Sequence, residues 1–110
     1  METLTIQQAL DLAVEHHKAG RLPDAENIYQ QILQQEPDQP TALHMLGVLS
    51  YQDGKNERAI ELISRAIELQ PDLAEAYNNL GLVQQRLDAI QDAIPNYQKA
   101  LLLQPDYVEA

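Results

Sequence analysis

The sequence predicts an all-α fold, a solenoid of three helix-turn-helix units, on the basis of two observations. Three Pro-Asp pairs, which begin at Pro37, Pro71 and Pro105, are 34 residues apart. The composition favours helices, because Ala, Leu, Gln and Glu are frequent and only 4 of the 110 residues are Gly. Self-similarity at a fixed period of this length is the signature of an array in which each unit packs against its neighbours.

The rest of the chain follows the same period. The second and third units share identical residues at matching positions, which are Ala42 and Ala76, Leu46 and Leu80, Gly47 and Gly81, Ala59 and Ala93, Ile60 and Ile94, and Ala66 and Ala100. The first unit is more diverged, but Leu12, Gly20 and Ala25 keep the register. The predicted organisation is a single domain, residues 1–110, with units at residues 6–39, 40–73 and 74–107 and the start of a truncated fourth unit at residues 108–110.

Within each unit the pattern predicts a helix, a short turn and a second helix. Gly20 and Gly54 lie where the first helix of a unit requires a residue in the left-handed conformation, and Asp88 occupies this position in the third unit. Pro23 and Pro40 lie near predicted helix starts, where the missing amide proton has little effect. These residues predict where helices begin and end.

Two further predictions concern helix starts. Asp72 with Glu75, and Asp106 with Glu109, have the spacing of an acidic capping box that begins the next helix. Pro95 lies at about the end of the first turn if its helix begins near Gln91. If that helix begins earlier, a kink is expected.

Composition excludes several classes of function. The net charge is −10, with 17 acidic residues against 7 Lys and Arg, so nucleic acid and anionic membrane surfaces are not expected partners. The chain has no Cys, which removes disulfides and thiolate metal sites. It has no long apolar run, and Met1 to Leu10 lack the pattern of a secretion signal. We therefore expect a cytoplasmic protein.

The repeated positions resemble the tetratricopeptide repeat family over residues 6–107. The family places a small residue after a Leu of the first helix, here Leu12-Ala13, Leu46-Gly47 and Leu80-Gly81. It places Ala where the two helices cross closely, here Ala25, Ala59 and Ala93, and then a large residue, here Tyr29, Ile63 and Tyr97. The departures are Ala9 and Leu43 in the usual aromatic slot, which only Tyr77 fits, and Ile32 where Ala is usual. The resemblance implies a right-handed superhelix.

The resemblance also implies a binding groove lined by the first helix of every unit. By position, the expected groove residues are Leu10, Val14, His17, His44, Met45, Val48, Tyr51, Asn78, Asn79, Leu82, Gln85 and Arg86. With the neighbouring positions of the first helices included, this face carries Asp11 and Glu75 against Lys18 and Arg86, so the groove is expected to be near neutral. The excess acidic charge is expected on the convex face and edges. Exposed apolar residues there would mark a contact zone.

Two specific modes of peptide binding can be compared with these positions. Cochaperones of the family grip a terminal carboxylate with basic residues, but the matching positions here are Leu10, Val14, Met45, Glu75 and Asn79, so this mode is not expected. The arrays of the O-linked N-acetylglucosamine transferases resemble this chain in carrying an Asn at the position of Asn79, where it hydrogen-bonds peptide backbone. Only the third unit has it here, so a peptide contact and a coincidence both remain open. Asn78 is a second candidate.

The sequence does not predict catalysis. His17 and His44 are expected to lie two helical turns out of step, roughly 10 Å along the helix axis, too far to share a metal. His16 is expected to be a core histidine. No Ser-His-acid arrangement, phosphate-binding loop or zinc spacing occurs in the sequence. We therefore expect no catalytic, cofactor-binding or metal-binding residues and no enzymatic activity in these residues.

The predicted function is protein–protein interaction, as a scaffold that binds a partner peptide or protein in the groove. One alternative is the substrate-recognition array of a larger enzyme, for instance a glycosyltransferase, whose catalytic domain lies elsewhere in a longer chain. A further alternative is self-assembly. The last helix is expected to leave Ile94, Tyr97, Leu101 and Leu102 uncovered, which predicts a homo-oligomer formed through this end.

Overall fold

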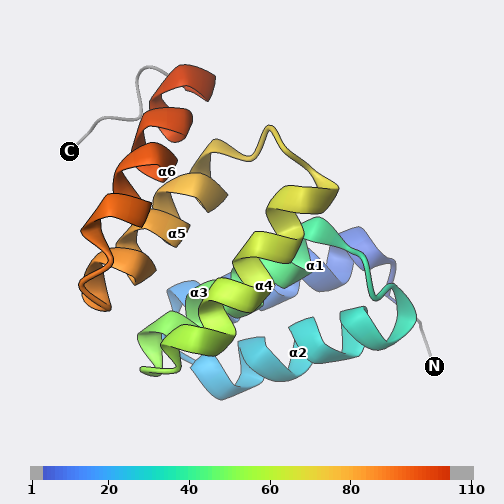
Figure 1. Ribbon diagram of the computed structural model, residues 1–110. Helices are drawn as coiled ribbons and strands as arrows, with labels where there is room; N and C mark the ends of the chain where they lie inside the picture. The colour runs from blue at the N-terminus through green and yellow to red at the C-terminus, as the bar shows by residue number, and fades with distance from the viewer. Residues whose placement is uncertain (1–3, 105–110) are drawn as a thin grey trace.

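The computed structural model describes residues 4–104. The described residues form six α-helices and no β-strand, which confirms the all-α class (Figure 1). The helices are α1 (Ile6–Lys18), α2 (Leu22–Gln35), α3 (Pro40–Gln52), α4 (Asn56–Leu69), α5 (Ala74–Arg86) and α6 (Ile90–Leu103). The predicted capping pair Asp106 and Glu109 and the predicted fourth unit at residues 108–110 lie outside the described residues.

The helices pair in chain order into three hairpins, α1 with α2, α3 with α4 and α5 with α6. The hairpins stack along one axis, which gives a molecule of 49 × 26 × 24 Å (Figure 1). Contacts between hairpins run from each to the next, through α2 with α3, α4 with α5, and α3 with α5. This arrangement is the helical-repeat solenoid that the period predicted.

The three hairpin turns share one backbone conformation. Gly20 and Gly54 have φ of 82° and 79°, and Asp88 has φ of 64°, so all three predicted left-handed residues are confirmed. In the first turn the amide of Arg21 donates to the carbonyl of His16 over 2.8 Å, a bond that closes the end of α1, and both other turns repeat it. Asp88 therefore replaces glycine without changing the turn.

The starts of α2 and α3 also follow the prediction, since Pro23 and Pro40 each lie at one of the first two helical positions. Pro95 is different. Helix α6 begins at Ile90, one residue earlier than the favourable start, so Pro95 lies inside the helix. Its missing amide leaves the carbonyl of Gln91 without its helical donor.

The capping box predicted at Asp72 and Glu75 is wrong. Helix α5 has Leu73 as its N-cap, which makes no side-chain hydrogen bond, and Asp72 lies one residue further out. A capping box lies instead at the start of α1. There the Oγ1 of Thr5 accepts from the amide of Gln8 over 3.0 Å, and the Oε1 of Gln8 accepts from the amide of Thr5 over 2.9 Å.

In the second and third hairpins the two helices cross closely at a glycine, whereas Ala13 occupies this position in the first. A Cβ atom built on Gly47 would lie 2.6 Å from the Cγ1 of Ile63 and 3.3 Å from the carbonyl oxygen of Ala59. A Cβ on Gly81 would lie 2.7 Å from the ring of Tyr97. Neither separation leaves room for a methyl group, so these glycines let α3 and α5 pack against the large side chain of the following helix.

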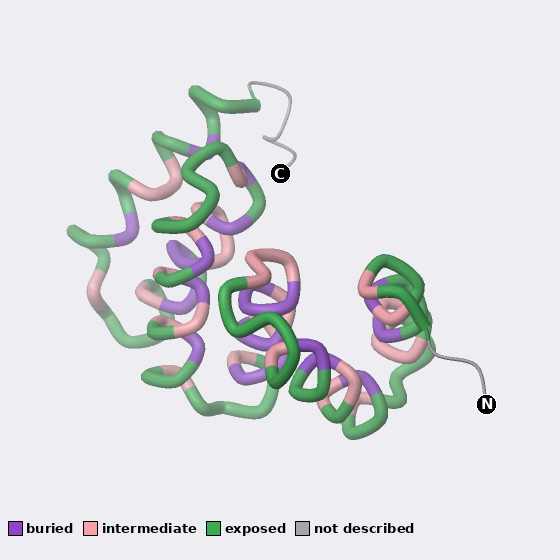
Figure 2. Tube along the Cα trace, turned by 90° about the vertical axis from the view of Figure 1, so that its right-hand side faces the viewer, coloured by how far each residue is buried: buried purple, intermediate pink, exposed green. Residues whose placement is uncertain are grey.

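The apolar core lies between hairpins as much as within them. One cluster joins α1, α2 and α3, and includes Leu10, Tyr29 and Leu46. A second joins α4 and α5 through residues such as Ile63 and Leu80. Figure 2 shows the buried segments on the sides of the helices that face one another. Because each hairpin completes the core of its neighbour, the array rather than the hairpin is the stable unit.

The glycine contact yields a prediction about stability. Gly47→Ala is expected to lower the free energy of unfolding by about 1–3 kcal/mol, because the new methyl group collides with Ile63. Ile63→Ala alone should remove roughly 2–5 kcal/mol by leaving a cavity. The double variant should lose less than the sum, since the methyl group enters the vacated space. Urea unfolding of the four proteins gives the comparison, and strictly additive losses would contradict the contact.

Pro95 yields a prediction of the opposite sign. Pro95→Ala restores the amide donor to the carbonyl of Gln91 inside α6 and is expected to raise the free energy of unfolding by about 1–3 kcal/mol. Pro40→Ala is the matched control, because Pro40 lies at the helix start, where its amide would have no helical acceptor. Equal melting temperatures for the two variants would show that Pro95 does not strain its helix.

Candidate interaction surface

The first helices of the three hairpins, α1, α3 and α5, are called the inner layer below. Each is joined to the next by pairs of side chains that are about one repeat apart in the sequence. The Nε2 of His17 donates to the Oε1 of Gln52 over 3.0 Å, which joins α1 to α3. The guanidinium of Arg86 lies 3.7 Å from the ring centroid of Tyr51 and donates to the Tyr51 carbonyl over 2.6 Å, which joins α3 to α5. His17 and Tyr51 occupy the same repeat position, and so do Gln52 and Arg86. The contact between α1 and α3 and the contact between α3 and α5, called the two junctions below, are therefore made by the same two repeat positions.

A second pair of positions differs between the junctions. Between α3 and α5 the Nδ2 of Asn79 donates to the Nε2 of His44 over 2.9 Å. The corresponding residues between α1 and α3 are Leu10, which belongs to the core, and Met45, which packs against it. An apolar contact at one junction is thus a polar contact at the next.

The imidazole of His44 is buried within this polar contact. Because the Asn79 amide nitrogen is a donor, the Nε2 of His44 accepts, which requires the neutral ring. Burial lowers the pKa of His44 below its ordinary value, and the nearby carboxylate of Glu75 acts in the opposite direction. Geometry and desolvation therefore both favour a neutral histidine at this junction.

Two of the twelve predicted groove residues are not accessible. Leu10 and His44 are buried, because the inner helices turn these positions toward the neighbouring hairpin rather than toward solvent. The other ten are at least partly accessible: Val14, His17, Met45, Val48, Tyr51, Asn78 and Asn79 are half-buried, and Leu82, Gln85 and Arg86 are exposed. The side-chain nitrogen of Asn79 uses one of its two N–H donors to bond to His44 within the array.

The histidine expected in the core is also corrected. His16 is only half-buried, and lies at the end of α1, where its Nδ1 accepts from the Nε of Arg21 over 2.8 Å and lies 4.0 Å from the Asp24 carboxylate. The histidine in the core is His44. The inner-layer pairs were missed because they are 35 residues apart, one more than the period. A search for complementary side chains at that spacing would have found them.

An apolar row runs along the inner layer. Val14, Val48 and Leu82 occupy the same position in the three units and are all at least partly accessible. Beside this row a shallow hollow of about 390 Å³ is lined by Tyr51, Leu82, Gln85 and Arg86. The hydroxyl of Tyr97 donates to the Oε1 of Gln85 over 2.7 Å, which leaves the Gln85 amide hydrogens free to donate. The inner layer therefore offers an apolar row with polar groups at one end.

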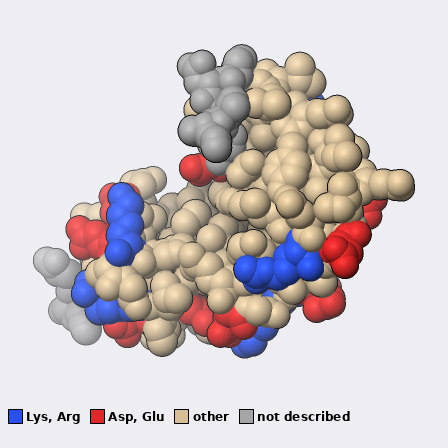
Figure 3. Space-filling model, turned by 90° about the vertical axis from the view of Figure 1, so that its left-hand side faces the viewer, with Lys and Arg blue, Asp and Glu red and all other residues tan. Residues whose placement is uncertain are grey.

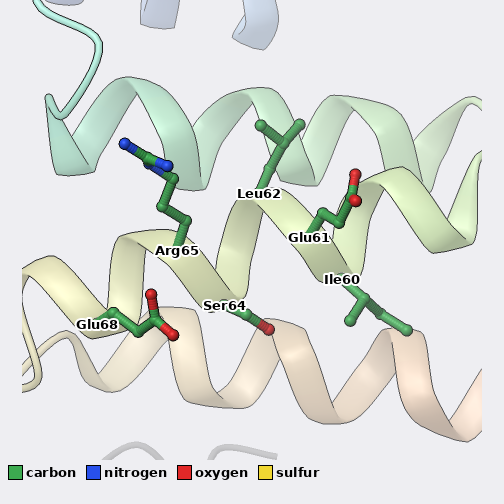
Figure 4. Close-up of a pocket in the computed structure, with 6 residues that line it drawn as sticks. All are labelled: Ile60, Glu61, Leu62, Ser64, Arg65 and Glu68. Carbon is green, nitrogen blue, oxygen red and sulfur yellow. The ribbon is translucent and has the colours of Figure 1, made fainter.

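Figure 3 shows a face of the molecule that is hollowed and largely covered by uncharged side chains, with charged groups gathered mainly toward its edges. A larger hollow, about 550 Å³, lies on α4 and is lined by Ile60, Glu61, Leu62, Ser64, Arg65 and Glu68. In Figure 4 Arg65 and Leu62 point to one side of α4 and Ile60 and Ser64 to the other. Arg65 is also paired with Asp38. The polar groups around this hollow do not point toward one another, so we favour the inner layer as the candidate interaction surface.

Within residues 4–104 no helix is long and apolar enough to cross a membrane. The same residues hold no group of three or more His, Asp or Glu side chains placed to bind a metal ion.

Family models match more than half of the chain. Residues 47–88 match a model described as a TPR repeat, and residues 74–107 match the tetratricopeptide repeat. A structure of a mutant of the Thermobaculum terrenum O-GlcNAc transferase is 34% identical over 97% of this chain and 21% of that one, with a TM-score of 0.92. The crystal structure of MamA is 25% identical over 94% of this chain and 60% of that one, with a TM-score of 0.85. The chain thus spans less than two thirds of either protein.

Other similar structures establish the fold alone. The second TPR of Spaghetti (RPAP3), bound to the HSP90 peptide SRMEEVD, is 18% identical over 90% of this chain and 92% of that one, with a TM-score of 0.84. The first TPR of the same protein, bound to the same peptide, is 18% identical over 99% of this chain and 86% of that one, with a TM-score of 0.88. No curated protein sequence matches the chain.

The buried His44 predicts a pH dependence of stability. The unfolded imidazole takes up a proton near pH 6.5, whereas the folded one does so only at lower pH. Below about pH 6.5 the unfolded state therefore binds more protons, and the free energy of unfolding should fall, by at most about 1.4 kcal/mol per pH unit from this group. Urea unfolding of the native protein and His44→Gln between pH 7.5 and 5 measures the contribution. Identical slopes for both would contradict it.

Proposed function

The chain belongs to the tetratricopeptide repeat family, and on that premise we propose that it binds a segment of a partner polypeptide along the inner face of α1, α3 and α5. Repeats of this family are protein-interaction modules. The observation that carries the proposal is the row of Val14, Val48 and Leu82, which ends at the hollow beside Tyr51 and Arg86. Apolar side chains repeated in register suit a ligand that runs along the array.

The chemistry of this face supports a segment with apolar and hydrogen-bonding side chains. The free amide hydrogens of Gln85 can donate to a backbone carbonyl, and Asn78 offers both a donor and an acceptor. Glu75, in the first turn of α5 and close to His44, opposes an acidic ligand at the junction of α3 and α5. An acidic terminal peptide such as the one held by the similar RPAP3 domains is therefore not the ligand that we propose.

A second candidate is that these repeats recognise the substrates of a larger enzyme. The similarity to the O-GlcNAc transferase structure, which is 34% identical over 97% of this chain, favours it. One N–H of Asn79 bonds to His44, which leaves the second N–H and the amide oxygen for a peptide backbone. In either case we propose that the repeats bind and do not catalyse. A cytoplasmic location and a homo-oligomeric state stay predictions.

The proposal predicts that Leu82→Glu weakens partner binding at least tenfold, about 1.4 kcal/mol, because it places a charge in the apolar row. Peptides selected on the native chain from a random phage-displayed library serve as ligands, with affinity measured by fluorescence anisotropy. Leu12→Glu is the matched control, since Leu12 on α1 is 37% exposed and Leu82 is 38% exposed. The control should bind within twofold of the native chain.

The proposal fails if the selected peptides bind both variants equally while circular dichroism shows the same helix content. It also fails if repeated selections on the native chain yield no peptide whose binding saturates.

A further inference from the structure

Arg86, the last residue of α5, is held in a fixed orientation by the end of α3 and the start of α4. Its guanidinium lies 3.7 Å from the ring centroid of Tyr51, and its Nη1 donates to the Tyr51 carbonyl over 2.6 Å and to the Oδ1 of Asn56 over 3.4 Å. Within residues 4–104 its Nε and Nη2 atoms have no hydrogen-bond partner. The edge of the guanidinium that these two nitrogens form can hold a carboxylate through two parallel hydrogen bonds.

No carboxylate in the described part of the chain, residues 4–104, forms an ion pair with this guanidinium. The Lys and Arg side chains that do form ion pairs there are Lys55, which pairs with Asp53 over 3.3 Å, and Arg65, which pairs with Asp38. The chain has 17 acidic residues against 7 Lys and Arg, so a shortage of carboxylates does not explain why Arg86 has no such partner among these residues. Arg86 is therefore an exposed cation with a fixed orientation and a hydrogen-bonding edge that the described residues do not use.

The exposure of Arg86 is a property of its repeat position. Lys18, Gln52 and Arg86 are the last residues of α1, α3 and α5, and all three are exposed. Gln52 is exposed although the third hairpin follows it, so this position stays accessible where the array continues. Gln52 also completes the junction of α1 with α3 by accepting from His17, without a charged group. A junction of this kind therefore does not require the charge that Arg86 carries.

We propose that this edge of Arg86 binds the carboxylate of an Asp or Glu side chain in the ligand segment, an inference that rests on the proposed function. Leu82 lies one helical turn before Arg86 on the same face of α5, and both line the hollow of about 390 Å³. The methylene groups of the ligand side chain contact Leu82, while its carboxylate accepts from Nε and Nη2. Glu75 lies in the first turn of α5, about 16 Å from Arg86 along the helix axis, a distance at which salt screens most of its repulsion. The ligand segment is thus apolar along the row and acidic at this end.

The probes for the test are peptides selected from a random phage-displayed library. They are synthesised with an amidated C-terminus, so that side chains supply their only carboxylates. Selection on the native chain should enrich peptides that carry an Asp or Glu close to an apolar residue. Selection on Arg86→Gln, which has at this position the side chain that Gln52 has in the second hairpin, should lose this enrichment. Circular dichroism checks that the variant remains helical.

A double-mutant cycle then tests for direct contact. Changing the shared acid of a peptide to its amide should lower the affinity for the native chain at least fivefold, but the affinity for Arg86→Gln less than twofold, because that variant has already lost the bidentate bond. Arg86→Lys keeps the charge without the planar fork, so it should distinguish the two peptides less well than the native chain. Lys18→Gln is the matched control, since it removes the same charge from the same repeat position on α1. It should leave the fivefold difference intact.

Several results would overturn the proposal. An unchanged preference for the acidic peptide on Arg86→Gln would leave Arg86 a structural link between α3 and α5. Loss of that preference on Lys18→Gln would indicate a general effect of net charge. Tighter binding of a peptide with phosphoserine in place of the acid would make phosphate the recognised group. Selected peptides that depend on Leu82 but share no acid would refute this inference alone, whereas selections without any peptide that depends on Leu82 would refute the proposed function as well.

Discussion

The close crossing of the two helices within a hairpin determines how the other surfaces of the molecule are presented. At Gly47 the helix backbone of α3 lies against Ile63 with no room for a Cβ atom, and that contact fixes the rotation of α3 about its own axis. With Gly47 turned toward α4, Leu46 is buried in the core shared with the preceding hairpin, and Val48 is left on the inner layer. The same residue pattern recurs around Gly81. In these two hairpins a single contact thus determines which residues face the core, which face the neighbouring hairpin and which stay accessible on the inner layer.

Most of the fold could be predicted because the relevant interactions are local and repeat every 34 residues. The left-handed turn residues and the helix-crossing glycines belong to this class. The period places the start of α5 at Ala74, 34 residues after Pro40, but the local spacing of Asp72 and Glu75 predicted a capping box one residue away from the N-cap that the helix uses, Leu73. Local capping preference is worth only about 1 kcal/mol, which tertiary packing can exceed.

The candidate surface was harder to predict, because it depends on the angle between successive hairpins. The period places Leu10 and His44 on the inner helices but does not say whether they face solvent or the next inner helix. The structure turns both toward the neighbour and leaves Val14 and Val48 accessible. The two junctions also differ in chemistry. The contact of Leu10 with Met45 is apolar and has no hydrogen bond to satisfy, whereas the hydrogen bond of Asn79 to His44 requires the neutral imidazole.

The end-to-end stacking of hairpins has a consequence for how the molecule opens. The helix pairs in contact belong to the same hairpin or to successive hairpins, a topology of low contact order that favours rapid folding. Among the described hairpins only the central one has neighbours on both sides, so either outer hairpin can open while the other two stay folded. Amide hydrogens of α3 and α4 should then exchange most slowly, and a ligand that spans all three inner helices would act by suppressing this fraying. Ligand binding along the inner layer and the cooperative unfolding of the three hairpins are therefore coupled.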